Sequence, residues 1–332
     1  MSNQLKQALQ YLIIFAIGGL FIYLVFKGTD WEDLWLKLKN TNYFWISVGM
    51  LVSLLSHVIR AYRATLLYDA MGYRISTTNS YHAVIIGYFM NYVIPRGGEV
   101  SRCASLMKTN QLPVEKGLGT VITERLVDLV ILTLILGLVF ILQFDVLYNY
   151  ITSNANGSEA ASSDGSMKLY VILALLAMGV FVFAFRNRLM QIGLVAKFFD
   201  KIKGFGQGLA SIRFVKQPVL FIVLSLAIWA CYILMMYFCL FAMESTAGLN
   251  FVQCLTVFAM GTIGVVIPAP GAGAGTYHFA VMQGLLLFGV DGADGKAYAT
   301  IVHGAQMILF IILGIISSIF VLVQQKNKTT TP

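Results

Sequence analysis

Long runs of apolar residues dominate the pattern of hydrophobic and polar positions along this chain. A helix that crosses a lipid bilayer needs about 20 consecutive, mostly apolar residues. Six runs meet this requirement, at about residues 8–26, 43–67, 117–143, 169–185, 218–243 and 297–323. The pattern therefore predicts an all-α integral membrane protein with six full transmembrane helices.

Two further apolar runs end in clusters of proline and glycine. Each run is followed by a second helical stretch, 79–95 by 99–109 and 251–268 by 276–290. Unpaired backbone groups are costly in lipid, so a broken helix at membrane depth is tolerated only inside protein or beside a water-filled cavity. Two breaks in corresponding parts of two halves are typical of a transporter substrate site.

The distribution of basic residues predicts the topology. Segment 186–216 contains seven Lys or Arg and one acidic residue, whereas the Ser-rich loop 152–166 contains no Lys or Arg. Short basic loops stay in the cytoplasm, so the first segment is expected inside and the second outside. Counting spans from these two points, segment 79–116 begins and ends inside, and segment 250–296 begins and ends outside. Both are therefore predicted to be re-entrant helical hairpins.

The same count predicts a multi-pass protein of the cell (inner) membrane with both termini in the cytoplasm. The order of elements occurs twice with opposite orientation, which predicts an inverted-topology repeat. The predicted parts are a first repeat at 1–150, a flexible extracytoplasmic loop at 151–167, a second repeat at 168–325 and a cytoplasmic tail at 326–332. A short residue match between the halves supports the repeat, although low-complexity apolar sequence also produces such matches by chance.

Composition agrees with a membrane protein. The chain is 58% hydrophobic and 11% charged, whereas a soluble domain carries about 25% charged residues. The formal net charge of +8 is interpreted as a signal of topology and lipid headgroup attraction, not of nucleic-acid binding. The four cysteines have no metal-ligand spacing, and neither a metal nor a cofactor is expected.

Charged and polar residues gather at the first break and in the helix that follows it. The candidate substrate-binding residues are Asn91, Arg96, Glu99, Arg102, Glu124, Arg125 and Asp128. Charges at membrane depth are costly unless they are paired or hydrated. One interpretation is a buried ion-pair network that clamps the hairpin to the helix. The other is a cytoplasm-facing site in which arginines bind a phosphate bidentately. The carboxylates are expected to stay ionised and to position the arginines, not to relay protons.

Two more arginines, Arg60 and Arg63, lie three residues apart on predicted helix 43–67. They are interpreted as side chains that snorkel to the membrane interface. The alternative is that they extend the basic surface of the first break.

The second break has a different composition. Its candidate residues are Pro268, Pro270, Gly271, Gly273, Thr276 and His278. The glycines allow close backbone approach, and Thr276 is expected to cap the following helix, whose N-terminus offers N–H groups. A packed turn between two helices explains the same residues. His278 and His303 either share a cavity or form separate structural hydrogen bonds.

The chain contains no recognisable motif of a hydrolase, zinc protease or nucleotide-binding enzyme. A transporter is therefore favoured over an enzyme.

A longer pattern carries a family resemblance. Gly87-x3-Asn91-x3-Pro95-Arg96-Gly97-Gly98-Glu99-x2-Arg102 is followed by Glu124-Arg125-x2-Asp128 and a late Pro-Gly-Ala-Gly. Over about residues 10 to 325 the chain resembles the lysylphosphatidylglycerol synthase transmembrane-region family. That family includes flippase-like proteins and the N-terminal part of the multiple peptide resistance factor, which is implicated in moving aminoacylated phosphatidylglycerol between leaflets.

The resemblance implies a flippase-like transporter for an anionic phospholipid or a polyprenyl-phosphate-linked lipid. This chain lacks a soluble aminoacyl-transferase domain, so lysyl transfer is not expected of it. It also departs from the family at 275–278, where Gly-Thr-Tyr-His stands in place of an often acidic position. The alternative function is a membrane-embedded transferase, or an accessory subunit whose partner is a lipid-modifying enzyme.

Overall fold

A computed structural model describes residues 3–95, 97–146, 148–149 and 215–329 of the chain. These residues form helices and short connections and contain no strand. The chain forms two compact units. The first consists of Met1–Glu124 together with Phe214–Pro332, and the second is Arg125–Arg213.

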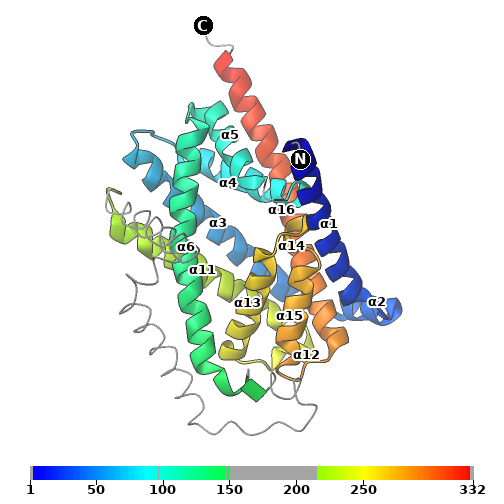
Figure 1. The fold of residues 1–332 in the computed structure, drawn as a ribbon. Helices are drawn as coiled ribbons and strands as arrows, with labels where there is room; N and C mark the ends of the chain where they lie inside the picture. Colours follow the sequence, from blue (N-terminus) through cyan, green and yellow to red (C-terminus); the bar gives the residue numbers. More distant parts are fainter. Residues whose placement is uncertain (1–2, 96, 147, 150–214, 330–332) are drawn as a thin grey trace, which may run out of the picture. The chain divides into compact units, whose positions relative to one another are not determined.

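Twelve helices are described, and Figure 1 shows their arrangement. They are α1 (Asn3–Phe26), α2 (Trp31–Asn40), α3 (Tyr43–Ala70), α4 (Thr77–Val93), α5 (Gly98–Asn110), α6 (Val114–Leu142), α11 (Pro218–Leu240), α12 (Glu244–Ala247), α13 (Phe251–Val266), α14 (Pro270–Gly273), α15 (Thr276–Leu286) and α16 (Gly292–Thr329). Helix α6 begins in the first unit and continues into the second from Arg125.

Local sequence explains where several helices begin. The residue before each of α2, α3 and α4 accepts hydrogen bonds through its side-chain oxygen from free N–H groups in the first turn of the helix. These residues are Asp30, Asn42 and Ser76. Asn250 and Gln253 form a reciprocal capping box at the start of α13. Such caps satisfy backbone donors that have no partner within the helix.

The first break lies between α4 and α5, which pack against each other as a helical hairpin. The two helices touch backbone to backbone, because a Cβ atom on Gly98 would lie 2.1 Å from the carbonyl oxygen of Gly87. The Oδ1 atom of Asn91 accepts a hydrogen bond from the Gly98 N–H at 2.9 Å. The glycines and Asn91 therefore join the two halves of this hairpin.

The second break lies between α13 and α15 and contains the single turn α14. Its backbone is left-handed at Gly271 (φ 62°) and at Ala272 (φ 55°). Gly275, at φ 88°, abuts α1, and a Cβ atom there would lie 2.8 Å from the backbone nitrogen of Ile22. Glycine is therefore needed at this position for two reasons: the backbone has a positive φ, and α1 lies too close for a side chain.

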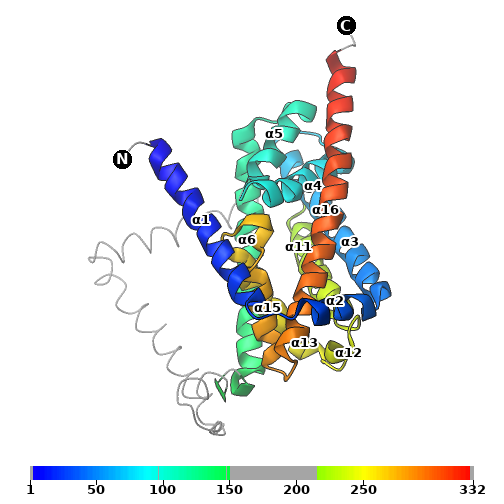
Figure 2. The same cartoon turned by 90° about the vertical axis from the view of Figure 1, so that its right-hand side faces the viewer.

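The two hairpins meet inside the first unit. Helix α14 packs against α4, and α16 packs against both α4 and α15. In Figure 1, α4 and α5 lie in the upper half of the view and α13 and α15 in the lower half, with α14 between them. Figure 2 shows that α1 begins and α16 ends on the same side of this unit.

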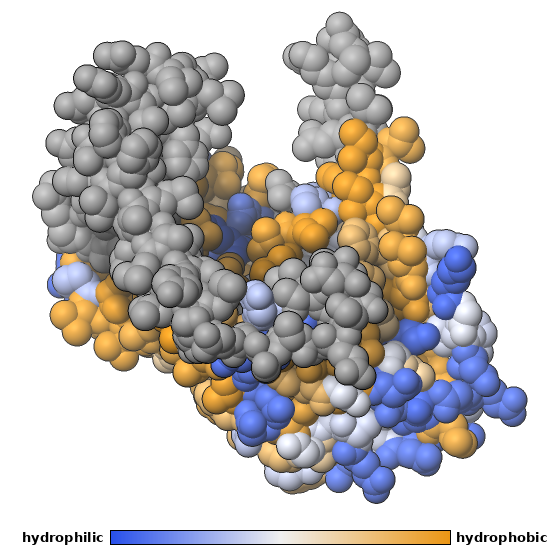
Figure 3. Space-filling model, turned by 60° about the horizontal axis from the view of Figure 1, so that its bottom comes forward, coloured by the Kyte–Doolittle hydropathy of each residue, from blue (hydrophilic) through white to orange (hydrophobic). Residues whose placement is uncertain are grey.

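Four described helices are long and apolar enough to cross a membrane, namely α3, α6, α11 and α16. A fifth span results if Leu12–Phe26 and α2, bent by 85° at their junction, are one broken span. Apolar side chains such as Leu134 on α6 and Leu322 on α16 are exposed, as expected of surfaces that face lipid. Figure 3 shows apolar surface beside a cluster of polar residues on one face.

The predicted all-helical membrane fold is confirmed, whereas the predicted count of six spans is not. The predicted span 169–185 and the loop 151–167 lie outside the described residues, as does almost all of the basic segment 186–216. Helices α4, α5, α13 and α15 have 17, 13, 16 and 11 residues, all below the length of a full span. Their re-entrant character and the inverted repeat stay predictions.

Candidate functional site

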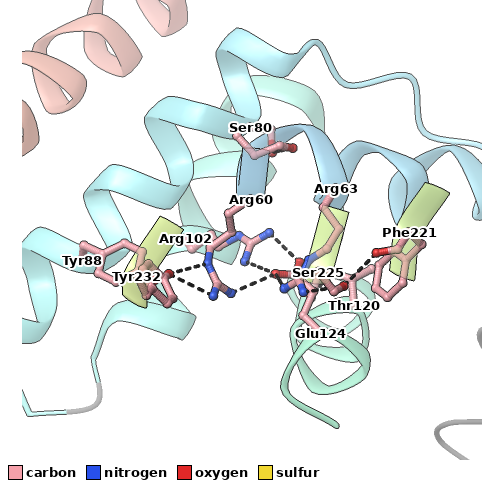
Figure 4. Close-up of polar contacts among 12 residues, drawn as sticks. Arg60, Arg63, Ser80, Tyr88, Arg102, Thr120, Glu124, Phe221, Ser225 and Tyr232 are labelled. Atoms are coloured by element: carbon pink, nitrogen blue, oxygen red, sulfur yellow. Dashed lines mark hydrogen bonds and ion pairs between the residues drawn. The ribbon is translucent and has the colours of Figure 1, made fainter. Parts of the chain in front are cut away.

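A single buried carboxylate, Glu124, lies among three arginines in the first unit. Both nitrogens of the Arg102 fork bind it, with Nη2 to Oε1 at 2.8 Å and Nη1 to Oε2 at 3.1 Å. Arg63 Nη2 lies 3.3 Å from Oε2, and Arg60 Nη1 lies 3.8 Å from the same oxygen. Figure 4 shows these side chains converging, and we call Arg60, Arg63, Arg102 and Glu124 the arginine cluster.

Three helices position the arginine cluster. Arg60 and Arg63 are three residues apart on α3 and therefore share one face of that helix. Arg102 lies one turn after Gly98 on α5. The close contact of Gly98 with α4 therefore fixes the position of Arg102 along the helix axis. Glu124 lies about three turns into α6, on its buried face.

Neutral hydroxyl groups also accept hydrogen bonds from the three arginines. Arg102 Nη2 also donates to Tyr68 Oη at 2.9 Å, and Arg63 Nη1 donates to Ser225 Oγ at 2.9 Å. Arg60 donates to Tyr232 Oη from Nε at 3.3 Å and from Nη2 at 3.1 Å. These hydroxyls come from α3 and α11, so the cluster joins α3, α5, α6 and α11.

The arginine cluster is almost free of solvent. Glu124 is 1% exposed, Arg63 0%, Arg60 4% and Arg102 7%. Charges in such a place must be paired, and removing one partner of a buried pair costs about 3–5 kcal/mol. All three arginines contact the Glu124 carboxylate. Among the described residues, the buried Nε of Arg102 has no hydrogen-bond partner. The cluster is thus rich in anion-binding groups as well as in ion pairs.

Not all of the predicted site residues belong to the first unit. Arg102 and Glu124 are in direct contact, and Asn91 lies at the hairpin crossing. Glu99 is half-buried in the first turn of α5, and Arg96 lies outside the described residues. Arg125 and Asp128 belong to the other compact unit, in which Arg125 is exposed and Asp128 is buried.

Arg60 and Arg63 correct the interpretation from sequence. They do not snorkel to an interface, because both are buried and directed at Glu124. Their signal was present in the sequence, since His57, Arg60 and Arg63 fall on one face of an otherwise apolar helix. Tyr68, Ser225 and Tyr232 were also missed, because a lone hydroxyl in an apolar helix gives no distinctive pattern.

The second break is a compact turn. Pro270 begins α14, and a Cβ atom on Gly18 of α1 would lie within 2.4 Å of its ring. Thr276 is not the cap of α15, because Gly275 holds that position and the Thr276 hydroxyl donates to the Gly273 carbonyl at 3.1 Å. Pro268 lies in the connection before α14, and Gly271 lies within α14.

Two histidines meet beside this turn. The rings of His278 and His303 are 5.0 Å apart between centroids and nearly perpendicular. The Nδ1 atom of His278 accepts a hydrogen bond from the Gly275 N–H at 3.2 Å. In the part of the chain that is described, no group of three or more His, Cys, Asp or Glu residues could hold a metal ion.

Comparison with known proteins shows the family of the chain. The family described as "Lysylphosphatidylglycerol synthase TM region" matches residues 9–314. The chain is similar to the UPF0104 membrane protein MJ1595 of Methanocaldococcus jannaschii, with 28% identity over 119 residues. That match spans 35% of this chain and 35% of the relative. No solved structure matches. This chain therefore belongs to the family of lysylphosphatidylglycerol synthase transmembrane regions.

Proposed function

We propose that this protein moves an anionic lipid between the leaflets of a membrane, and that the arginine cluster binds the phosphate of the lipid headgroup. The observation that carries the proposal is the convergence of three guanidinium groups on one buried carboxylate. Arginine binds phosphate bidentately through its planar fork. Membership of a family named for a phospholipid synthase supports a lipid as the substrate.

The cluster contains one arginine well suited to exchange partners. Arg102 binds both oxygens of Glu124, whereas Arg60 makes the longest of the three contacts, at 3.8 Å. Arg60 also reaches Tyr232, away from the carboxylate. A phosphate that enters the cluster therefore replaces the Arg60–Glu124 contact at the lowest cost, while Arg102 and Glu124 keep their geometry.

A series of aromatic side chains leads from the cluster to the second break. Tyr232 Oη lies 3.2 Å from Tyr88 Oη. Tyr88 stacks on Phe310 with 5.1 Å between ring centroids, and Tyr92 lies 6.3 Å from Phe310 and 6.2 Å from His303. We call these five residues the aromatic path. Its hydroxyl and imidazole groups offer successive contacts to a moving headgroup, which favours translocation over chemistry at one place.

We also propose that the hairpins α4–α5 and α13–α15 enter the membrane from opposite sides, with both termini in the cytoplasm. Their short helices, and the packing of α14 at the turn of the second hairpin against α4 of the first, support this arrangement. Single cysteines near Gly98 should react with an impermeant reagent from the cytoplasm, and those near Ala272 from outside. Reaction of both positions from one side would contradict the proposal.

The experiment that tests transport uses purified protein in liposomes with labelled phosphatidylglycerol in one leaflet. Arg60→Gln should lower the rate of transbilayer movement about tenfold, because it removes a charged hydrogen-bond donor from a buried anion site. Arg74→Gln is the matched control, since Arg74 is exposed in the connection between α3 and α4. The control should move lipid at the parent rate.

Two outcomes would contradict the proposal. A folded Arg60→Gln protein that moves phosphatidylglycerol at the parent rate would exclude the arginine cluster as the phosphate site. A change in headgroup mass during the assay, or movement only in the presence of a lipid-modifying enzyme, would favour the transferase or accessory function.

A further inference from the structure

The turn of the second hairpin contains two ionisable side chains that phosphate binding by the arginine cluster does not use. His278 lies in the first turn of α15, and His303 lies on α16. Each is more than nine-tenths buried, at 8% and 7% exposure. Ionisable groups buried within membrane helices are rare and usually mark functional sites.

The hydrogen bond of His278 fixes its protonation at one nitrogen. The Gly275 N–H donates to His278 Nδ1, so this nitrogen carries no proton and the neutral ring carries its proton on Nε2. The bond joins the first turn of α15 to a left-handed segment that includes Ala272, a non-glycine residue at positive φ. Residues at positive φ persist only when the surrounding structure holds them, and this cap is part of that support.

His303 has a ring nitrogen that is available to accept a hydrogen bond. Among the described residues, its buried Nε2 has no hydrogen-bond partner. The backbone of Ala272 lies within hydrogen-bonding reach of the same ring. His303 therefore carries an unused polar atom next to the His278 ring, at the turn itself.

The surroundings of the pair contribute aromatic rings and hydroxyls. Phe26 of α1 faces His278, while Tyr92 of α4 and Tyr277 of α15 face His303. On α13, Cys254 lies near Tyr277. No charged side chain is recorded against either imidazole within the described ranges. The two histidines are thus the groups at this turn that can gain a positive charge when the pH falls.

We propose that His278 and His303 form a proton-binding site, and that one proton bound there opens the turn of the second hairpin by displacing the Gly275 N–H from His278 Nδ1. A charged imidazole carries protons on both nitrogens, so it cannot accept from Gly275. The added proton occupies Nδ1, and the Nε2–H that the ring already carries has the unused Nε2 of neutral His303 beside it as an acceptor. Like charges at this separation repel, so the pair takes up one proton and not two.

A turn that opens with a proton provides a means of coupling lipid movement to a pH gradient. That use rests on the proposed function, whereas the proton-controlled cap does not. The aromatic path ends at His303, so opening of the turn would act on the far end of the route from the arginine cluster.

Hydrogen–deuterium exchange of the whole purified protein in lipid nanodiscs tests the cap directly. Exchange in peptides covering 270–280, corrected for the intrinsic effect of pH, should rise about fivefold between pH 8 and pH 4. His278→Asn places an amide oxygen where Nδ1 stands and does not titrate, so exchange should stay slow at both pH values. His278→Ala removes the acceptor, so exchange should be fast at both.

The control is His82→Asn, because His82 bonds Ser317 through its own Nδ1 on α4, away from this turn. It should keep the parent response. A parent protein whose corrected exchange at 270–280 does not change with pH would overturn the proposal, as would an unchanged response in His278→Asn. Since exchange requires no substrate, a pH-dependent turn in a protein that moves no lipid would overturn only the proposed function.

Discussion

The two hairpins hold a broken helix together with the same kind of bond but with different chemistry. In the first, the Asn91 amide oxygen accepts from the Gly98 N–H at 2.9 Å. In the second, the His278 imidazole accepts from the Gly275 N–H at 3.2 Å. An amide oxygen accepts at every pH, whereas an imidazole nitrogen accepts only while it is unprotonated. The first hairpin is therefore a fixed support, and the second can respond to protons.

Their glycines differ as well. Gly98 has ordinary helical geometry and is needed because the α4 backbone passes too close for a side chain. Gly271 and Gly275 adopt positive φ, at 62° and 88°, and so allow a left-handed turn. Two similar clusters of proline and glycine thus have different purposes. One brings an arginine next to a carboxylate, and the other places two histidines at a turn.

The charged hairpin gives the largest expected effect. Glu124→Gln keeps the size of the side chain but removes the negative charge that three arginines share, so the free energy of unfolding should fall by about 3–5 kcal/mol. The measurement is thermal or denaturant unfolding in detergent. Glu115→Gln is the control, because Glu115 is exposed in the first turn of the same helix and should change stability by less than about 0.5 kcal/mol.

A Glu124→Gln protein as stable as the parent would show that the arginine cluster does not depend on its carboxylate. The buried charges of the first hairpin would then contribute nothing to the free energy of unfolding that the neutral second hairpin lacks.

The close crossing of the first hairpin gives an intermediate effect. Gly98→Ala should lower the free energy of unfolding by about 1–3 kcal/mol, because the added methyl group forces α4 and α5 apart. Gly119→Ala is the control on α6, where a Cβ atom would meet no neighbour within 4 Å. The control should be neutral or slightly stabilising, since alanine favours a helix by up to about 1 kcal/mol over glycine. Equal stability of the two variants would place α4 and α5 farther apart than this structure does.

Hydropathy and helix breakers predicted the elements of the fold closely. The predicted run 79–95 corresponds to α4 at Thr77–Val93, and the predicted stretch 276–290 to α15 at Thr276–Leu286. These signals are local, because burial of apolar surface and the loss of a helical hydrogen bond at proline depend on nearby residues. The pairing of helices is not local, which is why the sequence indicated neither the α3–α11 packing nor the contact of α14 with α4.

The contacts of the arginine cluster were likewise predicted only in part from the sequence. The contact between Arg102 and Glu124 followed from two charged segments that had to be paired at depth. Arg63 was misassigned because snorkelling and burial have the same sequence pattern, and only the position of α6 decides between them. Arg125 and Asp128 belong to the other compact unit, so their part in the site stays a prediction.

The smallest effect concerns the fixed cap of the first hairpin. Asn91→Ala removes the acceptor of the Gly98 N–H and should lower the free energy of unfolding by about 1 kcal/mol. Because the amide does not titrate, the loss should be equal at pH 5 and pH 8, and unfolding curves at the two values measure it. Asn91→Gln, whose longer side chain places its oxygen differently, should recover only part of the loss. A loss that appears at one pH alone would mean that a titrating group also governs this hairpin, and the distinction between a fixed and a proton-responsive break would fail.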